Sequence, residues 1–185
     1  MHLPTPQFSR LVTVLAFDLS NPSLDSMILA WDHIAARYLN RLSSDPASAG
    51  RIESIRLLAI HDSVVSILGR GNSFIFSESS TGTSVAAALA AAAQASHDIL
   101  ASTFDSPTDL SDLGNSLEES LSFISDKREK AVGAATGAAS AAAFVRTFEL
   151  LSLNHRLNPA GGTRLTDPRN SAQITSGVTG WRRSA

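Results

Sequence analysis

The chain has 185 residues, of which 43% are apolar and only 17% are charged, and its net charge is −2. It contains no cysteine, which excludes disulfides, thiolate metal sites and cysteine nucleophiles. The near-zero net charge excludes a broad cationic field that would steer the protein to nucleic acid, and the scarcity of charge predicts that partner molecules cover part of the surface.

No membrane or export segment is expected. Residues 1–9 lack the basic and apolar regions of a signal peptide. The apolar run at residues 85–95 is about half of the ~20 residues that cross a bilayer. We therefore expect a soluble intracellular protein.

The first half of the chain predicts two amphipathic helices. Over residues 21–42, which open with a helix-capping Asn-Pro pair, apolar residues recur at steps of three and four. Asp45-Pro46 is expected to end this helix, because a residue before proline avoids helical geometry. A second helix is expected over residues 51–68, with Gly69 as its stop.

The second half predicts a short strand link and two helices rich in small residues. Ser73–Ser77 has the pattern of a strand or a tight extended link. Seven of the eight residues from Ala86 to Ala93 are alanine, which predicts a helix from Thr83 to about Thr103. After a loop at residues 105–115, the capping pattern at residues 116–119 predicts a fourth helix that continues to about Asn154.

The small residues of the last two helices predict close packing. Gly133-x-x-x-Gly137 lies in a run of Ala, Gly, Ser, Thr and Val, and such faces let backbones approach closely. We expect these helices to pack tightly on each other or on neighbouring subunits. The elements predict one all-α domain: an arm at residues 1–20, an antiparallel four-helix bundle over residues 21–154 with one elongated helix pair, and an irregular tail over residues 155–185.

No catalytic or cofactor site is expected. The five histidines have no ligand-type spacing, and in the pairs His61-Asp62 and His97-Asp98 neighbouring helical side chains are expected to point apart. The glycine pairs also lack the spacing of a nucleotide-binding loop. The chain therefore reads as a structural protein and not as an enzyme.

Two basic groups are candidates for phosphate contact. Arg51 and Arg56 lie in the second helix, and Lys127, Arg128 and Lys130 lie within one turn of the fourth. Arginine favours this role because its planar fork binds two phosphate oxygens. Solvated helix faces explain the same residues, and both interpretations stay open.

A carboxylate switch is the other candidate site, formed by Asp105, Asp109, Glu118 and Glu119. Carboxylates pressed together across a subunit contact raise one another's pKa and bind protons or, weakly, Ca²⁺. Loop solvation and the favourable charge of acids near a helix N-terminus explain these residues equally.

Five short motifs match one protein family in type and in order: Thr5-Pro-Gln-Phe8; Ala49-Gly-Arg51 with Arg56; Thr103-Phe-Asp105; Ser116-Leu-Glu-Glu119 followed by Lys127-Arg128; and Arg169-Asn-Ser, Ser176-Gly177 and Trp181. With the order of the elements, they resemble the coat proteins of rod-shaped plant RNA viruses of the tobacco mosaic virus type. The chain departs from the family where Ser106–Leu110 replaces an Arg-x-Arg segment and where Glu129-Lys130 replaces an Asp-Asp pair.

This resemblance implies a capsid subunit that polymerises helically around single-stranded genomic RNA, with the five cations named above as RNA contacts. Its partners would be copies of itself and the RNA, without a membrane, and its location would be the virion, or the host cytoplasm during assembly. An interpretation from another class is a cellular helical-bundle adaptor that docks a partner helix and binds no nucleic acid.

Overall fold

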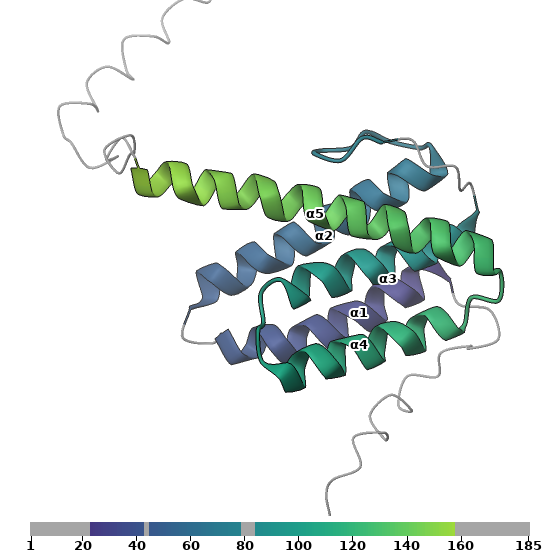
Figure 1. The fold of residues 1–185 in the computed structure, drawn as a ribbon, viewed down its shortest axis with the longest axis horizontal. Coiled ribbons are helices and arrows are strands. Elements are labelled where there is room, and N and C mark those ends of the chain that lie inside the picture. The colour runs from purple at the N-terminus through teal and green to yellow at the C-terminus, as the bar shows by residue number, and fades with distance from the viewer. Residues whose placement is uncertain (1–22, 43–44, 79–83, 158–185) are drawn as a thin grey trace, which may run out of the picture. The chain divides into compact units, whose positions relative to one another are not determined.

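The computed structural model describes residues 23–42, 45–78 and 84–157, and the chain divides into two units, residues 1–147 and 148–185. The second unit begins within the last helix, and only the helical residues 148–157 of it are described. Five α-helices and a short 3₁₀ turn (Asn40–Leu42) follow in order: α1 Leu24–Leu39, α2 Pro46–Leu68, α3 Val85–Ala101, α4 Pro107–Ser122 and α5 Lys127–Leu157 (Figure 1). The all-α class is therefore confirmed, and the described ranges contain no strand.

The alanine helix α3 is the central helix of the first unit. α1, α2 and α4 pack on it, and α5 approaches it closely at two glycines. A helix enclosed on all sides must be apolar or small all round, and α3 meets this requirement. Its buried residues are Ala87, Ala88, Leu89, Ala90, Ala91, Ala92, Ala93, Ala95, Ser96, Ile99 and Leu100.

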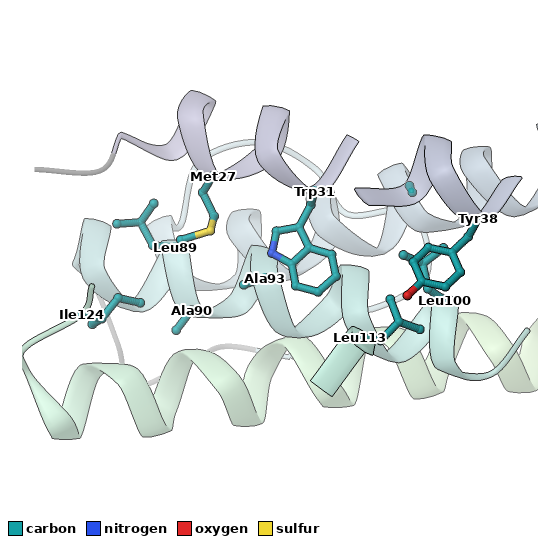
Figure 2. Packing of buried hydrophobic residues seen from close by; sticks show 10 residues of the cluster. Met27, Trp31, Tyr38, Leu89, Ala90, Ala93, Leu100, Leu113 and Ile124 are labelled. Carbon is teal, nitrogen blue, oxygen red and sulfur yellow. The ribbon is translucent and has the colours of Figure 1, made fainter. Parts of the chain in front are cut away.

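Large side chains from α1 and α4 fill the space that the alanines leave. Met27, Trp31 and Tyr38 of α1 lie on one stripe at helical spacing and pack toward α3 (Figure 2). Leu113 of α4 and Ile124, just after it, complete this cluster. Trp31 and Leu113 are fully buried, and burial of such large apolar side chains stabilises the packing of α1 and α4 on α3.

Glycines allow α5 to lie directly against α3. A Cβ atom at Gly133 would stand 2.1 Å from the carbonyl oxygen of Ala87, and one at Gly137 would stand 2.4 Å from that of Ala91. Both distances are far below van der Waals contact, so only glycine fits at either position. Close packing of the two small-residue helices is confirmed, and the partner of α5 is a helix of the same chain.

Helix directions differ from the predicted antiparallel pair. Gly133 faces Ala87 and Gly137 faces Ala91. The residue numbers of the two helices therefore increase in the same direction, so α5 runs parallel to α3. The chain reverses twice between them, because α4 runs back along α3 first (Figure 1). The predicted fourth helix is thus two helices, α4 and α5, and the bundle has five helices instead of four.

The predicted loop at residues 105–115 is also wrong. Pro107 occupies the first turn of α4, where its missing N–H costs nothing, and the helix continues through Ser116 to Ser122. Ser116 is no cap, since its hydroxyl donates to the carbonyl of Asp112 one turn earlier. The missed signal was the leucine spacing of this segment, which is helical: Leu110, Leu113, Leu117 and Leu121.

Helix starts and ends follow local capping chemistry. Asp45 caps α2 by accepting the N–H of Ser48, so α2 begins at Pro46 and not near residue 51. Gly69 ends it in the left-handed conformation with φ 63°, as predicted. Ser84 caps α3, and the hydroxyl of Ser23 caps α1. The predicted Asn-Pro cap at residues 21–22, the arm and the tail after residue 157 lie outside the described residues.

Candidate nucleic-acid interface

Lys127 and Arg128 stand in the first turn of α5, and both are exposed. Asp126 precedes them and accepts the N–H groups of Arg128 and Glu129 at 2.9 and 3.0 Å, which caps the helix. Within the described ranges, neither cation belongs to an ion pair. The positive end of a helix dipole disfavours cations, so helix stability does not explain this pair.

The remaining predicted cations differ from this pair in exposure or in position. Lys130 is half-buried one turn on, whereas Arg51 is exposed near the start of α2. The hydroxyl of Ser140 donates to the carbonyl of Ala59, which fixes the register of α5 against the antiparallel α2. Counting 1.5 Å per residue from that contact places Arg51 about 30 Å from Lys127 along the helix axes. These cations therefore do not form a single patch on one copy of the protein.

Arg56 is not available to a phosphate in this structure. Its side chain is 0% exposed and donates to Glu53 at 2.6 and 2.9 Å, to the hydroxyl of Ser96 at 3.0 Å and to Asp32. Burial opposes the guanidinium charge, but the hydrogen bonds to Glu53 and Asp32 outweigh it and raise the pKa of Arg56. In this structure Arg56 ties α1, α2 and α3 together.

The four carboxylates of the predicted switch do not form one cluster on a single copy of the protein. Asp105 is exposed just before α4, and Asp109 in its first turn is buried and accepts from Arg41 at 2.6 Å. Glu118 and Glu119 are exposed about 14 Å further along the helix, by nine residues of rise. The hydrogen bond to Asp109 raises the pKa of Arg41, so this carboxylate already has an internal partner.

Sequence reasoning missed a buried carboxylate on α2. Asp62 is fully buried and accepts the backbone N–H groups of Phe74, Ile75 and Phe76 at 2.8, 2.8 and 2.9 Å. Burial raises the pKa of Asp62, but the backbone hydrogen bonds outweigh this effect and hold it below its ordinary value. Residues 73–77 form no strand, so of the two predicted alternatives, a strand or a tight extended link, the strand is wrong.

The two His-Asp pairs also differ from expectation. His97 Nδ1 lies 2.7 Å from the Oδ1 atom of Asp98, and His61 Nδ1 lies 3.2 Å from that of Asp62. Side chains at adjacent helix positions therefore do meet in both pairs, contrary to the prediction. The amide of Gln94 holds Asp98 from one turn earlier, at 2.9 Å.

The described residues contain no group of three or more His, Asp or Glu side chains that could hold a metal ion. None of the helices in this part of the chain is both long enough and apolar enough to cross a bilayer. No protein-family model, curated protein or solved structure matches the chain.

Proposed function

We propose that this chain is a structural capsid subunit that assembles into a helical polymer around single-stranded RNA. Lys127 and Arg128 supply phosphate contacts, with Lys130 beside them. Arg51 adds a second contact from the opposite end of the helices, on a different stretch of RNA. Each subunit neutralises few phosphates, and affinity accumulates along the polymer.

The cation pair at the start of α5 is the observation that carries this proposal. Lys127 and Arg128 are exposed and stand at the positive end of a helix, a position that costs stability. Since the N–H groups of Arg128 and Glu129 already bind Asp126, the phosphate contact comes from the two exposed basic side chains. The pair also belongs to one of the motifs that resemble the coat-protein family.

Exposed apolar side chains support contacts between subunits. Leu29 on α1, Leu57 on α2 and Leu110 on α4 are each at least 40% exposed, and they lie on three different helices. A subunit in an open polymer needs contact surfaces on more than one side. Scattered surface leucines also occur on monomers, so the state of assembly must be measured.

Negative-stain microscopy of the purified protein at high concentration, with and without added RNA, tests the proposal. Rods or stacked rings are expected, and ultraviolet absorbance of purified particles should report packaged RNA. Discrete monomers or dimers under all conditions, from acid to neutral pH, would overturn the capsid proposal. That outcome would favour the adaptor interpretation.

A variant pair tests the RNA contacts. Replacing Lys127 and Arg128 with alanine should leave the subunit folded, since both side chains are exposed, but should lower the RNA recovered in particles. Arg37→Ala is the matched control, because Arg37 is an exposed cation on α1 that the proposal does not use. Undiminished RNA recovery in the double variant would refute the assignment.

A further inference from the structure

The segment after α2 is held in place at several points. Asp62 binds three successive backbone N–H groups at residues 74–76, and Phe76 is buried beneath them. The hydroxyl of Ser66 donates to the carbonyl of Glu78 further along. A loop fixed by a buried carboxylate and a buried aromatic ring presents its remaining side chains in a defined orientation.

Phe74 is the side chain that this arrangement leaves outside. It is 67% exposed, more than any other large apolar side chain in the part of the chain that the structure describes. The ring of His61 lies 5.2 Å from it, centre to centre, with the planes tilted by 60°. His61 is itself 44% exposed, so the two rings form a supported aromatic platform at the surface.

Cations share this end of the helices. Ile67 of α2 packs at the level of Ala87 and Ala88, and Glu129 of α5 accepts from Ser84 just before α3. The end of α2 and the start of α5 are therefore neighbours along α3. Arg70 follows α2 directly and is exposed. From these registers, the level of Asp62 lies about 15 Å from that of Lys127 along the helix axes.

The surroundings of Phe74 suit a nucleic-acid base better than an apolar protein surface. Within its segment, only Ile75 adds exposed apolar area, while Arg70 and Asn72 are polar and exposed. Protein-docking patches are contiguous and apolar over several hundred Å². Single-strand binding instead combines separate aromatic rings with cations along the backbone path.

We propose that Phe74, supported by His61, stacks on a base of single-stranded RNA whose phosphates contact Arg70, Lys127 and Arg128. The stacking is tolerant of sequence, because every base has a π-face. This inference rests on the proposed RNA-binding function and adds to it a base-contacting site that the basic residues alone do not provide.

The test compares two fluorescent 12-mers, oligo(A) and an abasic strand with the same phosphates, bound to the full-length protein. Phe74→Ala should weaken oligo(A) binding by about 5- to 150-fold, the range expected for loss of one stacked base. It should leave binding of the abasic strand and the salt dependence unchanged. The Lys127 and Arg128 double alanine variant should weaken binding of both strands.

Controls separate the outcomes. Phe74→Trp should retain oligo(A) affinity, and Ile75→Ala, which removes the exposed apolar side chain next to Phe74 but no aromatic ring, should not change it. Circular dichroism and protection of the residue 74–76 amides verify the fold. Equal oligo(A) binding by wild type and Phe74→Ala overturns this inference alone. No binding of either strand by wild type at concentrations where the protein assembles overturns the proposed function as well. A loss of self-association with unchanged RNA binding would make Phe74 a protein contact and overturn the base-stacking site.

Discussion

Replacing Gly133 with alanine should destabilise the protein, although alanine is the better helix former. In an exposed helix interior, Gly→Ala stabilises by about 1 kcal/mol. At Gly133 the new Cβ would stand 2.1 Å from the carbonyl oxygen of Ala87 and 2.7 Å from the Cβ of Ala90. Because the first of these atoms is backbone, no rotamer change relieves the clash, and α5 must move away from α3 by about 1 Å.

The expected net loss follows from these two opposing effects. Overpacking of a close interface costs about 1–3 kcal/mol, and sometimes more when backbone must shift. Because the clash at Gly133 is with a backbone atom, the upper part of this range applies, about 2–3 kcal/mol, and after the gain of about 1 kcal/mol from helix propensity is subtracted, Gly133→Ala should lose about 1–2 kcal/mol of unfolding free energy. With an m-value on the order of 2 kcal/mol/M, the urea midpoint should fall by about 0.5–1 M.

Gly114 supplies the matched control. It lies within α4, and a Cβ built there meets nothing within 4 Å. Gly114→Ala should therefore raise the urea midpoint, by the helix-propensity effect alone. Far-UV circular dichroism of both variants measures the difference. If Gly133→Ala is as stable as Gly114→Ala, the close approach of α3 and α5 does not exist and the parallel arrangement derived from it is wrong.

Three further predictions concern buried polar and backbone features. Arg56→Met should lower the unfolding free energy measured in urea by about 2–4 kcal/mol, because it leaves Asp32 and Glu53 without their shared partner. Because buried ion pairs are screened little by salt, this loss should change little when the salt concentration is raised. Since the pKa of Asp62 is held below its ordinary value, its contribution is present above about pH 4 and is lost as the pH falls through the lower folded pKa. The protection factors of the residue 74–76 amides, which correct for the slower intrinsic exchange in acid, should therefore fall in wild type as the pH is lowered, and Asp62→Asn should show low protection already at neutral pH. Gly69→Ala should cost about 1 kcal/mol, since φ at this position is 63° and nothing crowds the site; an unchanged melting temperature would contradict the left-handed cap.

The sequence predicted helix content well because each helix carries its own periodic or propensity signal. The alanine run and the Gly69 stop placed α3 and the end of α2 within a few residues. Residues 105–115 were misassigned because Asp, Ser, Pro and Gly are common in loops. The same residue types also fit a helix whose first turn holds proline and an acid, as in α4.

The candidate site was less predictable, because exposure depends on tertiary contacts. Arg51 and Arg56 look equivalent in the sequence, yet one is exposed and the other is enclosed by carboxylates from two helices. Only the packing of α1 against α2 brings Asp32 to Arg56. The structural role of Asp62 could not be predicted from the sequence either, because its partners are backbone N–H groups, which leave no pattern of side chains in the sequence.

Because α3 is the central helix, its small residues are not evidence for contacts between subunits. An alanine surface could have served contacts between subunits, but here other helices of the same unit enclose it, so its small side chains are explained by folding alone. The surface that remains for partners is different in kind: isolated leucines on α1, α2 and α4, an exposed Phe74, and cations at one end of the helices. Variants in the α3–α5 contact therefore probe stability and not polymerisation. Polymerisation has to be tested at the exposed leucines, where a substitution such as Leu57→Ser changes the surface without opening a cavity in the core.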